Sequence, residues 1–252
     1  NHRAMCEAWN RRLWKPASGL LFWMSHPSWP SVNWQFYTWD TDAHASYYGI
    51  QKANEPVHIQ VDQPDGTVTV VNHTRDPLDH LVATATAFDL SGAAIAAATA
   101  RVDVAANTVV TPMKTPVADA KSAYLLRLEL RDRGGAMRSA NDYWLAARPA
   151  DLRALGAMPA AEIGGALRLD RSGGRTLAAV TLHNASPTPA LMARVTLRDA
   201  ATGTRILPAF YSANYVTLMP GETREITVDA GAAAGALQAT VHGWNIRPAT
   251  IR

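Results

Sequence analysis

The sequence predicts a mainly β protein in which two immunoglobulin-like β-sandwich domains follow a short segment of mixed helix and strand. From residue 57 onward, apolar and polar residues alternate in short runs, as in strands with one buried face. Turn residues separate these runs about every 8 to 12 positions, a spacing typical of a sandwich. The residues before position 57 lack this period, and positions 1–39 hold six of the eight tryptophans.

The chain opens with a predicted helix over residues 2–13. Apolar residues recur every four positions on one face, as an amphipathic helix requires: Met5, Trp9 and Leu13. Charged residues follow the same spacing on another face and suit i,i+4 ion pairs: Arg3, Glu7 and Arg11. The dipeptide Lys15-Pro16 ends the helix, because a residue before proline avoids the α region.

Residues 20–23, Leu-Leu-Phe-Trp, are predicted to form a strand buried on both faces, since an uninterrupted apolar run is typical of a parallel core strand. The aromatic residues that follow would then lie beyond the end of this strand. Tryptophan and tyrosine rings in such a loop can stack on the apolar faces of sugar rings. The alternative, that these rings pack a domain junction, stays open for each of them.

Residues 54–150 are predicted to form the first sandwich. Its first two strands, 57–61 and 67–71, flank a Pro-Asp-Gly turn and predict a hairpin. Further strands are predicted at 81–88, 94–102, 124–131 and 142–146.

A linker is predicted over residues 148–159, because prolines at both of its ends interrupt the strand pattern. The second sandwich occupies the C-terminal part, so that the domain limits are 1–53, 54–150 and 151–252. Its strands are predicted at 167–170, 176–183, 193–198, 215–218, 224–228 and 238–242.

The two predicted sandwiches share an internal sequence repeat. The run VVNHTRDPLDHLVATATAFDLSG from residue 70 aligns with TLHNASPTPALMARVTLRDAATG from residue 181 once two residues are dropped. In each run an asparagine closes a strand, at Asn72 and Asn184, and the next strand ends at Asp89 or Asp199. Both asparagines fit the glycosylation sequon, but their equivalent positions favour a shared turn in which the side chain caps the strand end.

Composition argues against several classes of protein. Hydrophobic residues make up 48% of the chain and charged residues only 18%, so disorder is not expected. The net charge is +3, but Lys and Arg are dispersed, so no nucleic-acid partner is expected. No apolar run approaches the roughly 18 residues of a membrane helix, so no membrane partner is expected. No signal peptide opens the chain, which leaves the compartment open.

Reactive and metal-binding patterns are sparse. The single cysteine, Cys6, cannot form an intrachain disulfide and is expected to be buried or inert. The eight histidines lack the close pairing of metal ligands, so no metal and no other cofactor is predicted. No Gly-x-Ser-x-Gly elbow is present to support a serine hydrolase triad.

Two stretches resemble a known family. The run SGLLFWMSHPSWPSVNWQFYTWDTDAHASYYGIQKANEPVHIQ resembles the end of the catalytic barrel, and the exit from it, in the exo-β-glucosaminidase and β-mannosidase branch of glycoside hydrolase family 2. The run ILPAFYSANYVTLMPGETREITV, with VHGWNI after it, is similar to the last domain of the same enzymes. The matches lie near opposite ends of the chain in the expected order.

The resemblance implies a glycosidase part without its catalytic centre. Residues 1–53 would be the last helix and strand of a (β/α)8 barrel with the exit segment. Retaining members use two glutamates about 5 Å apart, which in this family lie on earlier barrel strands. The six glutamates of this chain lack that context, so no catalytic residue is predicted. The chain is then expected to be the non-catalytic C-terminal part of an exo-acting enzyme, which leaves β-mannoside and β-glucosaminide open as substrates.

Three tryptophans are predicted to bind substrate in the intact enzyme. The resemblance places Trp23 in the wall of the subsite for the non-reducing sugar and implies a cis peptide bond after it; the alternative is a buried strand-end aromatic. Trp29 precedes a proline and can project toward a pocket, and Trp34 follows on the same loop. Both can instead pack between barrel and sandwich. A further set is expected to pack in the core of the domain junction: Trp39, Tyr47 and Tyr48.

The expected partners follow from this interpretation: an oligosaccharide or glycoside substrate, the missing catalytic barrel, and a second chain in a homodimer if the barrel piece stays uncovered. A stand-alone carbohydrate-binding module and a purely structural or dimerising sandwich pair remain the alternatives. Few paired aromatics in the sandwich part favour the structural role over the binding module. Only the resemblance favours a periplasmic or secreted location.

Overall fold

The computed structural model describes residues 1–16, 18–31, 35–63, 65–117 and 122–252. Its contacts divide the chain into two compact units. The first unit combines Asn1–Trp23 with Gly49–Gly156, and the second combines Met24–Tyr48 with Ala157–Arg252. Among the described residues, no helix has the length and apolar character needed to cross a membrane. The domain limits expected from sequence remain predictions.

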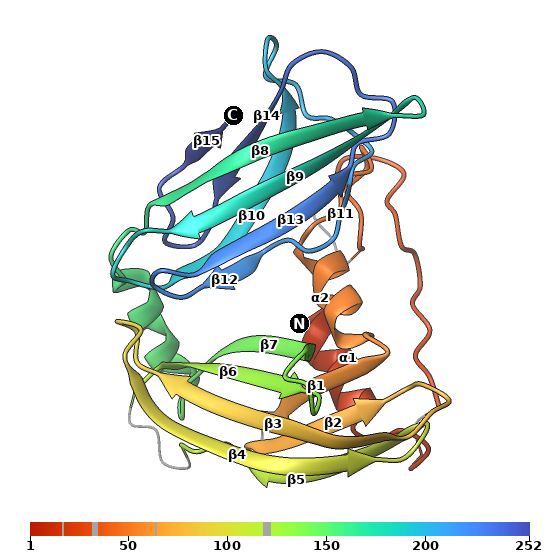
Figure 1. Cartoon of the computed structure of the whole chain (residues 1–252), viewed down its shortest axis with the longest axis vertical. Helices are drawn as coiled ribbons and strands as arrows, with labels where there is room; N and C mark the ends of the chain where they lie inside the picture. The colour runs from red at the N-terminus through yellow and green to blue at the C-terminus, as the bar shows by residue number, and fades with distance from the viewer. Residues whose placement is uncertain (17, 32–34, 64, 118–121) are drawn as a thin grey trace. The chain divides into compact units, whose positions relative to one another are not determined.

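The first unit contains a sandwich of two antiparallel sheets, with strand orders β1-β2-β5 and β4-β3-β6-β7 (Figure 1). The strands of the first sheet are β1 (Val57–Asp62), β2 (Thr67–Asn72) and β5 (Thr108–Lys114). Those of the second are β3 (Leu78–Phe88), β4 (Ala94–Val104), β6 (Tyr124–Arg131) and β7 (Met137–Leu145).

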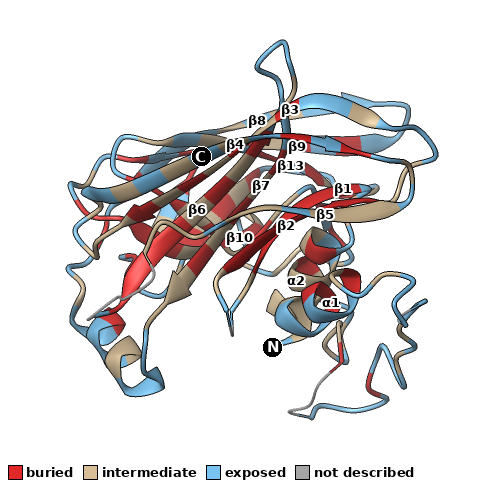
Figure 2. Cartoon of the chain, turned by 90° about the horizontal axis from the view of Figure 1, so that it is seen from below, coloured by how far each residue is buried: buried red, intermediate tan, exposed pale blue. Residues whose placement is uncertain are grey.

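The core of this sandwich is made by alternate residues of the strands, as the period of two predicts. Ile59 of β1 and Leu126, Leu128 and Leu130 of β6 are almost wholly buried in it. The strand β2 is unusual because all of its residues are buried, which Figure 2 shows as a continuous red stretch. A strand buried on both faces needs a covering layer on its outer side as well.

A helix, α1 (His2–Asn10), contacts β1 in the first unit and covers polar residues of that strand. The helix ends three residues earlier than predicted, because the amides of Arg12 and Leu13 bond to carbonyls three residues back, and the left-handed Trp14, at φ 63°, follows. Its buried side chains are Cys6, Glu7 and Asn10, whereas Met5 and Trp9 are exposed. The burial expected for Cys6 is confirmed.

The strand predicted at residues 20–23 is wrong. These residues are irregular, and Leu21 and Trp23 are 98% and 80% exposed. A parallel strand needs neighbours to pair its backbone groups and cover its faces. None of the described strands pairs with this segment, so the apolar run alone does not make a strand.

A second helix, α2 (Ala45–Ala53), was not predicted from sequence and lies where an irregular exit segment was expected. Its residues up to Tyr48 belong to the second unit and the remainder to the first. The linker expected at 148–159 contains a 3-10 helix, η1 (Pro149–Ala157), with Leu155 buried.

The second unit is also a sandwich of two antiparallel sheets, with strand orders β12-β10-β14-β15 and β11-β13-β9-β8. The first sheet contains β10 (Ala190–Asp199), β12 (Val216–Leu218), β14 (Leu237–His242) and β15 (Ala249–Ile251). The second contains β8 (Ile163–Ser172), β9 (Arg175–Asn184), β11 (Phe210–Tyr211) and β13 (Thr223–Asp229). Every strand predicted from sequence beyond residue 56 is present, and β5, β11 and β15 are additional.

The internal repeat is confirmed in its hydrogen bonds. Asn72 ends β2 and donates to the carbonyls of Asp76 and Ala105, at 2.8 and 3.1 Å. Asn184 ends β9 and donates in the same way to Thr188 and Leu218, at 2.9 and 3.1 Å. Both side chains are completely buried, so the capping role is confirmed and neither amide is accessible to a glycosylating enzyme in the folded chain.

Candidate functional site

The predicted sugar-binding tryptophans lie in an irregular segment that carries several exposed aromatic side chains. Trp23 and Trp29 are 80% and 68% exposed. Trp34 lies outside the described residues. The cis peptide bonds of the described residues precede Pro16 and Pro208, and the bond after Trp23 is not among them. The structure therefore presents Trp23 and Trp29 as rings with free faces and leaves their binding role a prediction.

Trp29 lies on a loop whose two ends are tied together. The carbonyl of Ser25 accepts hydrogen bonds from the amides of Phe36 and Tyr37, at 3.0 and 3.3 Å. Two residues inside this loop, Pro27 and Gln35, are buried, whereas Trp29 points to solvent. The base of the loop therefore packs within the second unit, while the side chain of Trp29 stays accessible to solvent.

The packing expected for three other aromatic residues holds only in part. Tyr48 is 5% exposed and belongs to the core of the second unit, where its ring meets those of Tyr211 and Tyr215. Tyr47 is partly buried against the same core. The expectation for Trp39 is wrong, because this side chain is 53% exposed on a tight turn.

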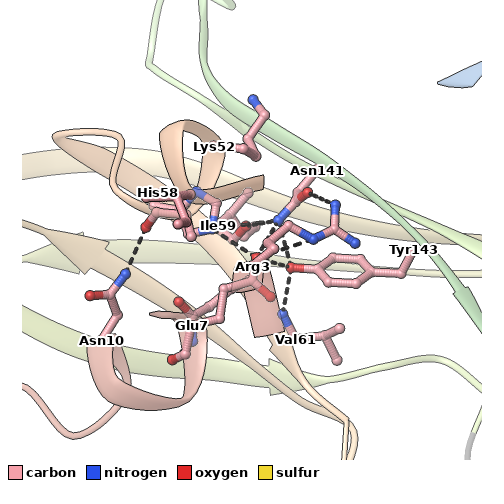
Figure 3. A network of polar contacts seen from close by, with 12 residues as sticks. Arg3, Glu7, Asn10, Lys52, His58, Ile59, Val61, Asn141 and Tyr143 are labelled. Atoms are coloured by element: carbon pink, nitrogen blue, oxygen red, sulfur yellow. Dashed lines mark hydrogen bonds and ion pairs between the residues drawn. The ribbon is translucent and has the colours of Figure 1, made fainter. Parts of the chain in front are cut away.

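A buried polar network in the first unit is the second notable feature, and Figure 3 shows its side chains converging. Oε1 of Glu7, on α1, accepts hydrogen bonds from Asn141 Nδ2 and from the Tyr143 hydroxyl of β7, each at 2.8 Å. His58 of β1 places Nε2 3.1 Å from the same oxygen. Arg3 donates to Asn141 at 2.9 Å and lies over the ring of Tyr143.

The same histidine reaches a second carboxylate. Nδ1 of His58 lies 3.2 Å from Oε2 of Glu55, which also accepts from the Ser139 hydroxyl at 2.9 Å. The other oxygen of Glu55 accepts from Lys52 Nζ at 2.6 Å. His58 thus bridges a carboxylate on α1 and one between α2 and β1.

The electrostatics of this bridge favour an imidazolium between two carboxylates. Burial by itself lowers the pKa of His58, but the hydrogen bonds to Glu55 and Glu7 outweigh it and raise the pKa above its usual value. Burial raises the pKa of Glu55, but His58 and Lys52 together bring it below the usual value. Burial, followed by the charge of Glu7, raises the pKa of the Tyr143 phenol.

The network is a docking joint rather than a catalytic pair. Glu7 is 3% exposed and His58 is fully buried, so no substrate can reach them in this fold. The amide of Gln60 donates to the Glu7 carbonyl at 2.6 Å, and hydroxyls of Ser139 and Tyr143 accept from the backbone amides of β1. The first of these bonds fastens α1 to the edge strand β1, and the other two link β7 to β1; all three satisfy groups that would otherwise be unpaired.

Sequence reasoning missed this joint. The sequence pattern placed Glu7 in a row of i,i+4 ion pairs with Arg3 and Arg11. In the structure its carboxylate oxygen Oε1 lies 3.9 Å from Arg3 Nε. The available pattern was the polar alternation of Ser139, Asn141 and Tyr143, which puts three polar side chains on the inner face of β7. Within the described residues, no cluster of three or more His, Cys, Asp or Glu side chains is arranged to hold a metal ion.

Two family models match the chain. The immunoglobulin-fold domain of exo-β-D-glucosaminidase matches residues 141–246, and the mannosidase immunoglobulin/CBM-like domain matches residues 67–147. The chain therefore carries the immunoglobulin-fold domains of the exo-β-glucosaminidase and mannosidase branch of glycoside hydrolase family 2. This agrees with the family that the sequence resembles.

Relatives of this branch match the chain over most or all of its length. An exo-β-D-glucosaminidase from Streptomyces avermitilis is 32% identical over 100% of this chain and 31% of its own length. The crystal structure of the exo-chitosanase CsxA from Amycolatopsis orientalis covers 100% of this chain and 33% of its own, with a TM-score of 0.92 and 29% identity. A β-D-mannosidase from Dictyoglomus thermophilum shares the fold at a TM-score of 0.74 and 16% identity.

The chain spans about a third of the length of these exo-β-glucosaminidases. It corresponds to their non-catalytic immunoglobulin-domain portion, as the resemblance implied. Glu7 is buried, and Glu55 is bonded to Lys52, His58 and Ser139; both facts agree with a non-catalytic portion.

Proposed function

We propose that the protein to which this chain belongs hydrolyses terminal β-linked glucosamine residues, and that the chain supports its catalytic domain. The observation that carries this proposal is the match over 100% of the chain to an exo-β-D-glucosaminidase at 32% identity. The relatives that match across most of the chain include exo-β-D-glucosaminidases from bacteria and from fungi. The glucosaminide is therefore favoured over the mannoside.

The chain's own contribution is to hold the end of the catalytic barrel. Met5, Trp9 and Leu21 are 37%, 43% and 98% exposed, although they are the kind of side chains that proteins bury. Residues 1–53 contribute the last barrel helix and the exit segment, and these apolar side chains pack against the remainder of the barrel. Large exposed apolar patches mark association sites, and the relatives are about three times as long as this chain.

Trp23, Trp29 and Trp34 are proposed to contact the sugar in the intact enzyme. Their support is the exposure of the first two rings on an irregular segment. Stacking of a sugar on such a ring needs an uncovered aromatic face, which both side chains provide. Trp39, which is also exposed, lies on the turn that follows this loop.

The test compares the full-length protein and the isolated 252-residue chain on p-nitrophenyl β-D-glucosaminide and on the matching β-mannoside. We expect the full-length protein to prefer the glucosaminide and the isolated chain to hydrolyse neither, because general acid and nucleophile each supply orders of magnitude in rate. Preference for the mannoside overturns the substrate assignment. Turnover by the isolated chain that disappears when one of its own glutamates is replaced overturns the non-catalytic role.

A stand-alone carbohydrate-binding role is the second candidate, and the CBM-like description of the model matching residues 67–147 is the observation that favours it. Isothermal titration of the isolated chain with glucosamine oligomers distinguishes the two. Millimolar or tighter binding by residues of the first sandwich supports the second candidate. Binding that appears only in the full-length protein and falls when Trp29 is replaced supports the first.

A further inference from the structure

The loop that carries Trp29 continues into a small acidic turn that two arginines of the second sandwich hold. Arg194, on β10, and Arg205, in the connection after β10, both bond to Oδ2 of Asp42; the contact from Arg205 Nη1 is 2.9 Å long. Arg205 also bonds to Asp40. Asp42 is only 7% exposed, so this carboxylate is shielded from water where two guanidinium groups meet it. Removing one partner of an ion pair shielded in this way is costly, because it leaves the other charge buried without compensation.

The acidic turn is rigid in itself. The hydroxyl of Thr38 donates to Asp40 and accepts from the amide of Asp42 at 3.1 Å, and the Thr38 amide donates to the Asp42 carbonyl at 2.9 Å. Tyr37 and Ala43 then pair as an antiparallel bridge. These bonds hold the Asp40 carboxylate and the backbone of Asp42 in place within the turn.

The turn is joined directly to the base of the tryptophan loop. Phe36 and Tyr37, which precede the turn, donate to the carbonyl of Ser25, where the loop begins. The amide of His44, which follows the turn, donates to the Phe36 carbonyl at 3.3 Å. Hydrogen bonds and the short backbone segments between them thus connect the two arginines to both ends of the loop on which Trp29 lies.

Aromatic packing provides a second link to the same sandwich. The ring of Tyr37 lies 5.4 Å from that of Tyr47, and Tyr47 lies 5.1 Å from Tyr48 in the core. Tyr48 meets Tyr215, whose ring carries the guanidinium of Arg194 at 5.6 Å. Arg194 therefore takes part in both the ionic and the aromatic link.

We propose that Arg194 and Arg205 are positioning residues: through Asp40 and Asp42 they fix the loop of Trp29, so that the second sandwich determines where this ring stands when the intact enzyme binds its sugar. The proposal rests on the proposed sugar contact of Trp29, and it extends the role of the second sandwich from scaffold to part of the substrate-binding apparatus. Neither arginine touches the substrate in this assignment.

The first experiment tests, in the isolated chain, whether Arg205 holds the loop of Trp29 in place. Amide hydrogen exchange is compared for the wild type, Arg205→Ala, Arg205→Lys and the matched control Arg175→Ala, which removes an exposed guanidinium paired with Asp229 on the same sandwich. We expect Arg205→Ala to speed exchange of the amides of Phe36 and Tyr37 at least tenfold, with partial recovery in Arg205→Lys and no change in the control. Unchanged exchange at these amides in Arg205→Ala overturns the proposal.

The second experiment is a double-mutant cycle on the full-length enzyme with p-nitrophenyl β-D-glucosaminide. We expect Arg205→Ala to lower kcat/KM about tenfold, mainly through KM, since a misplaced binding group costs up to about 100-fold. In a Trp29→Ala background the same substitution is expected to have little further effect, because residues acting through one group are not additive. Full additivity overturns the proposal.

The two failures are distinguishable. If Trp29→Ala leaves kcat/KM unchanged while Arg205→Ala loosens the loop amides, the proposed sugar contact of Trp29 is wrong and the proposal fails with it. If Trp29→Ala lowers kcat/KM but Arg205→Ala leaves both exchange and kinetics unchanged, the sugar contact stands and the positioning role of the arginines is wrong.

Discussion

Nε2 of His58 lies 3.1 Å from Oε1 of Glu7, although the two residues are 51 positions apart and both are almost completely buried. This contact joins α1 to β1, and Asn141 and Tyr143 of β7 complete the environment of the carboxylate. A buried carboxylate without its partners is costly, so the contact specifies how the helix docks. In the proposed enzyme it connects the end of the barrel to the first sandwich.

Replacing Glu7 is expected to destabilise the first unit. Glu7→Ala leaves a buried imidazole and two further buried donors, Asn141 and Tyr143, without their acceptor. Breaking a buried charged pair costs about 3–5 kcal/mol. Urea unfolding of the isolated chain measures the loss. Glu225→Gln, at an exposed position of β13, is the control and is expected to change stability by less than about 0.5 kcal/mol. Equal effects of the two substitutions would contradict the assigned role of Glu7.

The stabilising effect of His58 is expected to depend on pH in a definite direction. Its pKa is raised in the fold, so its contribution is fully present below the unfolded value of 6.5 and is lost as pH rises through the folded pKa. Glu55, whose pKa is lowered, contributes above its unfolded value of 4.5 and loses this contribution as pH falls through the folded pKa. The difference in unfolding free energy between wild type and His58→Gln should therefore be largest between these two values. A difference that grows steadily toward pH 9 would disprove the charged bridge.

The two strand-closing asparagines should have matching energetic roles. Asn72→Ala and Asn184→Ala each remove a buried side-chain amide. Its NH2 group donates to at least two backbone carbonyls, and its oxygen accepts from a backbone amide of the turn. Leaving such backbone groups unpaired costs about 1–3 kcal/mol each, so we expect a loss of at least about 2 kcal/mol at either position. Chemical denaturation gives the values. His183→Ala, at the exposed neighbouring position, is expected to be nearly neutral.

Two adjacent glycines of β8 should respond differently to the same substitution. A Cβ on Gly165 would lie 1.8 Å from the carbonyl oxygen of Thr181, whereas a Cβ on Gly164 meets no atom within 4 Å. Gly165→Ala must displace β8 from β9, with an expected loss of about 3 kcal/mol. Gly164→Ala is expected to be neutral or to stabilise the strand slightly, because alanine loses less entropy on folding. Thermal unfolding of both variants checks the contrast.

The exposed face of α1 should matter only when the barrel is present. Trp9 is 43% exposed in this chain, so Trp9→Ala is expected to leave the stability of the isolated chain nearly unchanged. In the full-length protein the same substitution should cost about 1.5–3 kcal/mol, which is the value of burying a large apolar side chain. Unfolding of both proteins by urea provides the comparison. Equal small effects in both would show that the barrel does not cover this face.

The sequence by itself determined the two sandwiches, because strand periodicity is a local property. The alternation of residues 57–61 and 67–71 was enough to predict β1 and β2. The turns at Asn72 and Asn184 followed from an internal repeat that both sandwiches share. The resemblance of the aromatic segment and of the last domain was enough to predict the family.

Only the tertiary structure decided what covers those strands and what the polar residues do. His58 and Gln60 occupy the polar positions of an alternating strand, yet α1 buries both. The local sequence of a strand does not predict that a helix about 50 positions earlier in the chain will cover it. Residues 20–23 have the composition of a core strand but remain irregular, because a parallel strand exists only beside neighbours that pair with it. The composition of a segment indicates how much apolar surface it can bury, whereas the contacts available in the tertiary structure determine whether that surface is buried.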